Sequence, residues 1–255
     1  MPCWDPKDGP RNAGTRTVWA DEHVRPSDLQ DDTGLPDPRS GDGRVTASFP
    51  DRVPVDQDPG GQGMAMTSRC LHPHVYPVEA DTLLMLEAAR EDCRTDDRVL
   101  EVGTGSGHIA ASLHPLVGCI LAVDINPHAA HAARRRGLDV VRTDLFAGLR
   151  GRFDLVLFNP PYLPTSPEER IDDWLEYALD GGPDGRRTIA RFLGGLREVL
   201  APRGRALLLV SALTGIGEVR ALAGACGYAT GVVRECVTEG ERLVVLRITG
   251  EGHDA

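Results

Sequence analysis

The sequence has 255 residues, of which 41% are hydrophobic, so the chain can form a domain of ordinary size with a sizeable core. Its 38 acidic side chains outnumber the 28 basic ones, and the resulting net charge of −10 disfavours nucleic acid as a substrate unless the arginines gather on one face. The sequence lacks an apolar run of the roughly 18 residues that a membrane helix needs, and charged residues stand where a signal peptide would be apolar, so we expect a soluble, cytoplasmic protein.

Six cysteines are present, but none forms a CxxC pair or clusters with histidine at the spacing of metal ligands. We expect reduced thiols, several of them in the core. His72 and His74 form an HxH pair, which without further ligands nearby faces solvent far more often than it binds metal. The sequence therefore predicts no zinc or iron site.

Residues 1–63 differ in composition from the rest of the chain. They contain 9 Pro and 8 Gly but only eight residues from Leu, Ile, Val and Phe, and they sustain no periodicity. Such a segment buries too little apolar surface to offset the entropy that it would lose on ordering. We predict a disordered Pro/Gly/Asp-rich tail over residues 1–63, followed by one domain over residues 64–255.

From residue 75 onward, helix and strand signals alternate. The first helix begins with Asp81, which could cap it, and later helices show apolar residues at helical spacing. The expected helices cover residues 81–90, 107–114, 127–136, 186–200 and 217–226. The expected strands cover residues 98–102, 119–124, 138–142, 153–158, 205–210, 228–233 and 242–248. This alternation predicts a doubly wound α/β sandwich that binds ligands at the carboxyl ends of its strands.

A glycine-rich loop lies between the first expected strand and the next helix. Gly103, Gly105 and Gly107 allow a ligand to approach the backbone, and the third glycine also allows close packing of helix and strand. A dinucleotide fingerprint would place the third glycine one residue later, where this chain has His108. The GxGxG spacing therefore favours S-adenosylmethionine over NAD.

Three acidic residues lie near this loop. Asp124 ends the second strand about twenty residues after the loop, where a carboxylate can accept hydrogen bonds from two ribose hydroxyls; the alternative is a helix-capping acid before Asn126. Asp144, followed by Leu145, lies after the third strand and could accept the adenine amino group, or it could form a plain acidic turn. Glu101 lies beneath the loop, where its carboxylate could orient loop amides or the cofactor.

The strongest reaction-site motif is Asn159-Pro160-Pro161-Tyr162, directly after the fourth strand. The two prolines fix φ and remove two donors, so the motif is a rigid platform of hydrogen-bond acceptors. Asn159 Oδ1 and the Pro160 carbonyl could accept both hydrogens of a planar amide or amino group and aim its nitrogen at a methyl donor. Tyr162 could stack on that group. A simple turn after a strand is the alternative.

Together these residues resemble the HemK-like release-factor glutamine methyltransferases, in particular their short eukaryotic and archaeal branch. The similarity covers residues 74–249 and includes three further blocks. These blocks are Val75-Tyr76 with Asp81-Thr82, Gly181–Gly185 with Arg186, and Gly240–Arg247. The resemblance implies a Rossmann-like, seven-stranded class I methyltransferase sandwich, with a mostly parallel sheet and an antiparallel last strand.

The resemblance also implies the residues that contact S-adenosylmethionine: Thr82, Glu101, Gly103, Asp124, Asp144, Leu145 and Asn159. Asn159 would also hold the acceptor amide. The family usually has a proline two residues after the tyrosine and a glutamate directly before the Asp-Thr pair, whereas this chain has Val78 and Ala80 at those places. Members of the short branch need a small zinc-binding partner along the exposed third strand, here residues 138–142.

The sequence therefore supports three N-methylation hypotheses. The first acceptor is a glutamine side-chain amide in a protein such as a translation release factor, in a Gly-Gly-Gln context, as the resemblance implies. The others are the adenine amino group of DNA or RNA and a small molecule, because an acceptor platform alone does not distinguish one planar NH₂ group from another. An NAD-dependent oxidoreductase would share the fold but not the glycine spacing.

Overall fold

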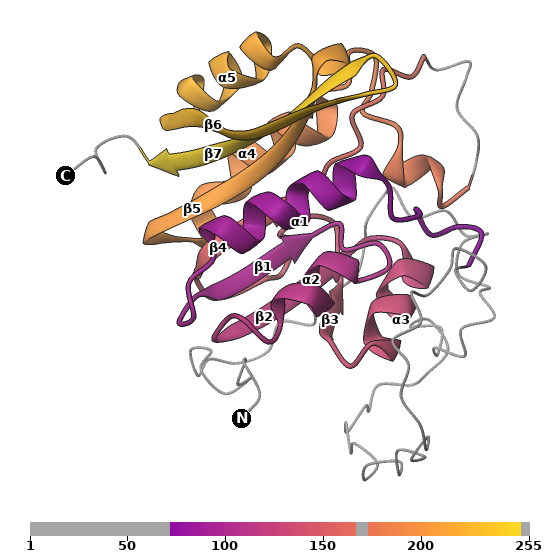
Figure 1. The fold of residues 1–255 in the computed structure, drawn as a ribbon, viewed down its shortest axis with the longest axis vertical. Coiled ribbons are helices and arrows are strands. Elements are labelled where there is room, and N and C mark those ends of the chain that lie inside the picture. The colour runs from indigo at the N-terminus through magenta and orange to yellow at the C-terminus, as the bar shows by residue number, and fades with distance from the viewer. Residues whose placement is uncertain (1–71, 167–172, 251–255) are drawn as a thin grey trace, which may run out of the picture. The chain divides into compact units, whose positions relative to one another are not determined.

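The computed structural model describes residues 72–166 and 173–250 (Figure 1). The helices and short 3₁₀ turns are α1 (Ala80–Asp92), α2 (His108–Leu113), α3 (Pro127–Arg135), η4 (Glu176–Ala178), α4 (Arg187–Val199), η5 (Ala212–Thr214) and α5 (Ile216–Ala225). The strands are β1 (Arg98–Val102), β2 (Cys119–Asp124), β3 (Asp139–Arg142), β4 (Phe153–Phe158), β5 (Leu200–Ser211), β6 (Tyr228–Thr238) and β7 (Glu241–Gly250). The predicted tail of residues 1–63 lies outside the described residues.

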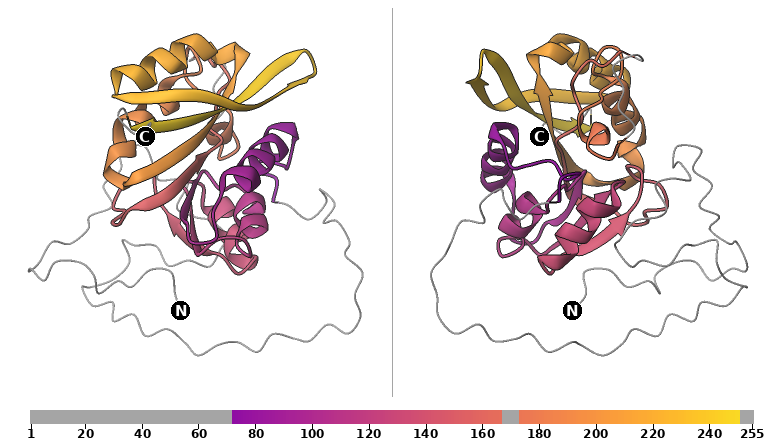
Figure 2. Two further views of the ribbon diagram at one scale, coloured as in Figure 1. Left: turned by 60° about the vertical axis from the view of Figure 1, so that its left-hand side comes forward. Right: turned by 90° about the vertical axis from the view of Figure 1, so that its right-hand side faces the viewer.

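The strands form one seven-stranded sheet in the order β3-β2-β1-β4-β5-β7-β6. β1 to β5 are parallel to one another, and β7 inserts antiparallel between β5 and β6. Figure 2 shows β6 and β7 as a long hairpin at one edge of the sheet, and β3 forms the other edge. The seven-stranded, mostly parallel sheet with an antiparallel last strand is confirmed.

Two apolar clusters cover the two faces of the sheet. Alternate strand residues such as Leu155 and Leu157 pack with α1, α2 and α3, while Val156 and Phe158 pack with α4 and α5. Figure 1 shows the first helical layer in front of the strands. Side chains that alternate along a strand point to opposite faces, so a continuous apolar run serves both layers.

The predicted boundaries are wrong at three places, one of which is β5, since it begins at Leu200 and not at residue 205. α1 begins at Ala80 with Glu79 as its N-cap residue, so Asp81 lies inside the first turn and does not cap the helix. β6 continues to Thr238, beyond the predicted end, because its backbone pairs with β7 along the whole hairpin despite the charged side chains of Arg234 and Glu235. The length of an edge strand depends on how far it pairs with its neighbour, and local composition does not specify that pairing.

A buried ion network ties the opposite end of the sheet together. Arg205 on β5 donates to both carboxylate oxygens of Asp97, at 3.0 and 2.7 Å, and to Asp92 at the end of α1, at 2.6 Å. All three side chains are almost fully buried. Arg205 also donates to the carbonyl of Asp154 on β4. The network joins α1, the residue before β1, β4 and β5. It lies away from the carboxyl ends of the parallel strands.

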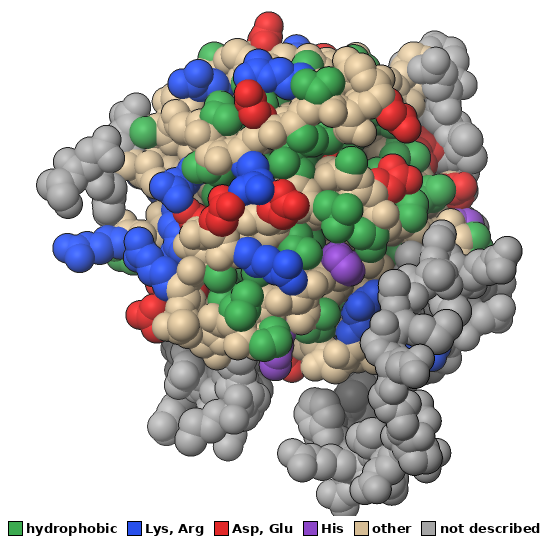
Figure 3. Space-filling view, in the orientation of Figure 1, with side chains coloured by type: hydrophobic (Ala, Val, Ile, Leu, Met, Phe, Trp, Pro, Cys, Tyr) green, Lys and Arg blue, Asp and Glu red, His purple; other side chains and the backbone are tan. Residues whose placement is uncertain are grey.

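None of the helices formed by residues 72–166 and 173–250 combines the length and the apolar surface that a bilayer crossing requires. The four described cysteines, Cys93, Cys119, Cys226 and Cys236, form no disulfide with one another, and they are half-buried and not inside the core, where several were expected. On the face that Figure 3 shows, basic and acidic side chains are interspersed and do not form one basic surface.

Candidate active site

The register of the parallel strands brings three segments of the sequence to one place. Val102 of β1 is the partner of both Val123 on β2 and Phe158 on β4. The residues that follow, including Gly103 and Asn159, therefore leave the sheet side by side at its carboxyl edge. This edge is where parallel α/β proteins bind their ligands.

The glycine loop has the backbone that its sequence requires. Gly103, Gly105 and Gly107 all have positive φ, at 66°, 55° and 74°. A Cβ on Gly107 would lie 2.9 Å from side-chain atoms of Ala133 and Leu138, so this glycine permits close packing against α3 and the start of β3. A Cβ on Gly105 would meet nothing within 4 Å. The middle of the loop therefore faces open space, as a ligand-binding loop must.

Asp124 holds this loop from the end of β2. Its Oδ2 accepts the amide N–H of Gly105 at 2.8 Å, and its Oδ1 accepts that of Asn126 at 2.9 Å. Burial raises the pKa of the Asp124 carboxyl to about 6. The alternative role as a helix cap belongs to Asn126, whose side chain caps α3 by accepting the amide of His128. The carboxylate keeps acceptor capacity for a further donor.

Glu101 lies beneath the loop and is almost fully buried. Its Oε2 accepts the Thr104 hydroxyl at 2.6 Å and the Ala110 amide in the first turn of α2 at 3.1 Å. Burial raises the pKa of the Glu101 carboxyl to about 8. These contacts join the loop to the helix that follows it, and a role of Glu101 in orienting the cofactor stays a prediction.

The NH₂ group of the Asn159 side chain has a hydrogen-bond partner, whereas its carbonyl oxygen has none among the described residues. Its Nδ2 donates to Asp81 Oδ2 on α1 at 3.1 Å. Its Oδ1 is buried, and no hydrogen-bond donor among the described residues contacts it. A buried carbonyl oxygen without a donor costs about 1–3 kcal/mol, so a donor from outside the chain would stabilise it.

Two tyrosines flank this asparagine. Tyr162 is half-buried and packs against the core cluster under α1, while the Tyr76 hydroxyl donates to Asp81 Oδ2 at 3.3 Å. Burial, and next the negative charge of Asp81, raise the pKa of both tyrosine hydroxyls well above the usual range. Both hydroxyls therefore keep their protons and can donate.

The glycine-rich block at residues 181–185 supports the reaction-site motif. Leu163, directly after Tyr162, exchanges backbone hydrogen bonds with Leu179 and Gly181 at 3.1 and 2.9 Å. A Cβ on Gly185 would overlap the carbonyl oxygen of Tyr162. The two motifs, separated in the sequence, are thus one packed unit.

The remaining predicted cofactor-binding residues are Thr82, Asp144 and Leu145, and each makes a different kind of contact. Thr82 is buried, and its amide and hydroxyl both donate to Asp81 Oδ1, at 2.5 and 3.2 Å. Asp144 pairs with Arg191 of α4 at 2.6 Å, a partner that the sequence does not reveal. Leu145 has a positive φ of 48°, which is rare for a residue with a side chain, and packs near the second core cluster.

The HxH pair has a third histidine beside it. The His72 ring stacks on that of His128 with centroids 4.0 Å apart, and the carbonyl of His74 accepts Asn126 Nδ2 at 2.7 Å. These contacts connect the segment before α1 to the start of α3. His72 is exposed, as predicted, but His74 is half-buried. No group of three His, Cys, Asp or Glu side chains within the described ranges is arranged to hold a metal ion.

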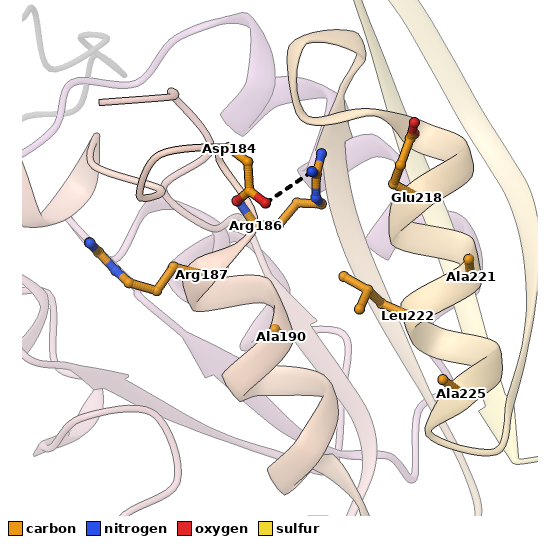
Figure 4. A pocket seen from close by; sticks show the side chains of 8 residues that line it. All are labelled: Asp184, Arg186, Arg187, Ala190, Glu218, Ala221, Leu222 and Ala225. Atoms are coloured by element: carbon orange, nitrogen blue, oxygen red, sulfur yellow. Dashed lines mark hydrogen bonds and ion pairs between the residues drawn. The ribbon is translucent and has the colours of Figure 1, made fainter. Parts of the chain in front are cut away.

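A separate open groove of about 500 Å³ lies between α4 and α5 (Figure 4). Arg186, Arg187 and Ala190 line one side, and Glu218 and Leu222 are among the α5 residues on the other. Arg186 is held by Asp184 at 2.9 Å. The groove contains none of the predicted cofactor or reaction-site residues.

Comparisons with known proteins identify similar methyltransferases. The family model described as the methyltransferase small domain matches residues 76–171. A Methanocaldococcus jannaschii protein, named as a putative protein N5-glutamine methyltransferase, is 41% identical over 155 residues, which are 58% of this chain and 78% of that protein. The Mus musculus protein named methyltransferase HEMK2 is 40% identical over 146 residues, 51% of this chain and 68% of the mouse protein.

One solved structure is similar over nearly its whole chain. It is the E. cuniculi Mtq2–Trm112 complex, described as responsible for methylation of the translation termination factor eRF1. The similarity covers 70% of this chain and 99% of that chain, with 27% sequence identity and a TM-score of 0.59.

Proposed function

The chain belongs to the HemK-like glutamine methyltransferase family, and we propose that it methylates the side-chain amide of a glutamine in a translation release factor. It is an S-adenosylmethionine-dependent methyltransferase. The observation that carries the proposal is the buried Asn159 Oδ1, which has no donor among the described residues. A primary amide N–H is a donor of the kind that this oxygen lacks.

The residues at the strand ends fit the cofactor. Gly105 leaves its side of the loop open, and the Asp124 carboxylate keeps acceptor capacity for a ribose hydroxyl. We assign cofactor contacts to Thr82, Gly103, Gly105, Gly107, Asp124, Asp144, Leu145 and Asn159, with Glu101 supporting the loop from beneath. When bound, S-adenosylmethionine supplies a methyl group on a positively charged sulfur, which is itself the leaving group.

The chain's part in the reaction is to position and activate the amide nitrogen. Its lone pair is delocalised into the neighbouring carbonyl, so the nitrogen is a poor nucleophile. Asn159 Oδ1 and the Pro160 carbonyl would accept its two hydrogens and increase the electron density on nitrogen. Tyr162, packed in place by the block at 181–185, would cover the planar group and exclude water.

A small activating partner is part of the proposal. β3 is an edge strand, and an edge strand leaves backbone groups free to pair with another chain. The similar E. cuniculi structure is a complex with Trm112. In this chain the Val140 carbonyl on β3 accepts Arg134 Nη2 at 3.0 Å, so an added strand would share or replace that contact. A release factor works at the ribosome, and we therefore propose a cytoplasmic location.

The test uses a purified release factor, the full chain with and without a Trm112-like partner, and isotope-labelled S-adenosylmethionine. We expect label in the wild-type factor and none in a variant whose Gly-Gly-Gln glutamine is replaced by alanine. Equal labelling of both factors would reject the glutamine as acceptor. Label in added DNA or RNA instead would favour the adenine alternative.

A further inference from the structure

The buried carboxylate of Asp81 accepts four hydrogen bonds, although a residue in the first turn of a helix requires none from its side chain. Oδ1 accepts the Thr82 amide and hydroxyl, and Oδ2 accepts the Tyr76 hydroxyl and Asn159 Nδ2. The side chain does not cap α1, whose N-cap residue is Glu79, and Asp81 is only 4% exposed. Its position therefore needs an explanation other than helix capping.

An ionised carboxylate only accepts hydrogen bonds, so Asp81 decides which end of the Asn159 amide faces it. The NH₂ end must face Oδ2, because the carbonyl end would put two acceptors 3.1 Å apart. The Asn159 carbonyl must then point the other way, and this is the oxygen that lacks a donor. Without Asp81, the two ends of the amide would differ little in their preference for either side.

We propose that Asp81 is a positioning residue, which holds the Asn159 amide with its carbonyl toward the acceptor and so makes the site select a group that donates hydrogen bonds. The inference rests on the proposed function, because it concerns the same asparagine. An NH₂ acceptor would meet a carbonyl oxygen in the wild-type site. With the asparagine turned over, it would meet another NH₂ group and be repelled.

The charge of Asp81 adds to the orientation. A hydrogen bond to a carboxylate is stronger than one to a neutral group, and hydrogen bonds in sequence polarise one another. The bond from Nδ2 to Asp81 therefore increases the negative partial charge on Oδ1. The Tyr76 hydroxyl lies within hydrogen-bond distance of the same Asp81 oxygen and, at 3.2 Å, of Glu79 Oε2. The segment before α1 therefore fixes the Asp81 carboxylate in place.

Asp81→Asn is the most informative single variant. The Thr82 amide belongs to the helix backbone and cannot turn away, so the new side chain must keep its oxygen on that side. Its NH₂ group then faces Asn159 and forces that amide to turn over. We expect kcat to fall about 100-fold, as for loss of a positioned polar group, with cofactor affinity within about threefold of wild type.

Asp81→Asn combined with Asn159→Asp reverses the pair and tests the orientation itself. The amide introduced on α1 would donate to one oxygen of the carboxylate introduced after β4, while the other oxygen of that carboxylate would face the acceptor. We expect kcat of the double variant to be at least about tenfold above that of Asp81→Asn. Glu87→Gln is the matched control, because it removes a charge from the same helix at a side chain that pairs with Arg234 on β6; we expect its kcat to stay within about twofold of wild type.

A readout without turnover keeps the inference separate from the proposed function. In ¹⁵N-labelled full-length protein, the Asn159 side-chain NH₂ signal can be assigned by its loss in Asn159→Ala. We expect one of its protons to be shifted downfield and protected from exchange in wild type, and both effects to vanish in Asp81→Ala. Unchanged signals, or a double variant no more active than Asp81→Asn, would overturn the positioning role. A wild type with these signals that leaves release-factor glutamine unlabelled would instead reject only the proposed substrate.

Discussion

Asp124 Oδ2 accepts the amide N–H of Gly105 at 2.8 Å, so the acid at the end of β2 shapes the loop at the end of β1. A single carboxylate thereby links the two segments that the sequence predicts to hold the cofactor. The same oxygen is proposed to hold a ribose hydroxyl, and the loop and the ribose contact therefore depend on one residue.

Asp124→Ala is expected to abolish cofactor binding, because it removes both proposed ribose acceptors and the support of the Gly105 amide. Isothermal titration calorimetry of the full chain with S-adenosylmethionine measures this directly. Affinity equal to that of wild type would remove Asp124 from the ribose site. Glu218→Gln, on the distant α5 groove, serves as a control for charge removal.

The pKa of Asp124 predicts how cofactor affinity depends on pH. Burial holds this pKa at about 6, and only the ionised carboxylate has all its lone pairs free to accept. We expect affinity to increase as pH rises from about 5 to 7, and the dependence to disappear in Asp124→Asn. The same slope in the variant would show that another group titrates.

Glu101 predicts a pH dependence of stability. Its pKa is raised by burial from 4.5 to about 8, so between these values the folded state binds a proton that the unfolded state has released. The contribution to the free energy of unfolding therefore falls as pH rises from 4.5 to 8. Glu101→Gln, which keeps an oxygen for Thr104 and Ala110, should flatten this part of the profile in denaturant titrations. An unchanged profile would mean that Glu101 does not titrate in this range.

Asn159→Ala separates binding from chemistry. It removes the proposed acceptor of the amide hydrogens but leaves Asp124 and the glycine loop intact, so cofactor affinity should change little. Turnover should fall by about two to three orders of magnitude, as when one positioned donor or acceptor is removed from an active site. Normal turnover by this variant, measured with isotope-labelled cofactor, would refute the mechanism.

Arg205→Ala tests the network at the other end of the sheet. The change leaves the buried carboxylates of Asp97 and Asp92 without their main partner, although Arg247 still contacts Asp92. Breaking a buried ion pair by removing one partner costs about 3–5 kcal/mol in the free energy of unfolding. Urea denaturation followed by circular dichroism would measure the loss. A change below about 1 kcal/mol would contradict the structural role.

The order of helices and strands, the glycine loop and the position of Asn159 could be predicted from the sequence because each depends on local patterns. Continuous apolar runs specify central strands, and a strand followed by glycines specifies a loop with positive φ. The parallel order then brings the strand ends together without further information. Residue positions that depend on a single strand or a single turn could therefore be predicted from the sequence.

Contacts between residues far apart in the sequence could not be predicted from it. Asp81 has the local sequence of a helix cap, and its contact with Asn159, 78 residues away, exists only in the folded chain. The pairing of Asp144 with Arg191 and the approach of His128 to His72 are of the same kind. These contacts follow from the packing of helices on the sheet, which a local pattern does not specify.

The most direct test of the proposed function is unbiased. The full chain is incubated with isotope-labelled S-adenosylmethionine and a lysate of the cells that produce it, in parallel with Asn159→Ala, and every labelled species is located by tandem mass spectrometry. We expect label on the side-chain nitrogen of a release-factor glutamine with wild type, and its loss with the variant. Label confined to nucleic acid or to a small molecule, or no label at all, would contradict this expectation.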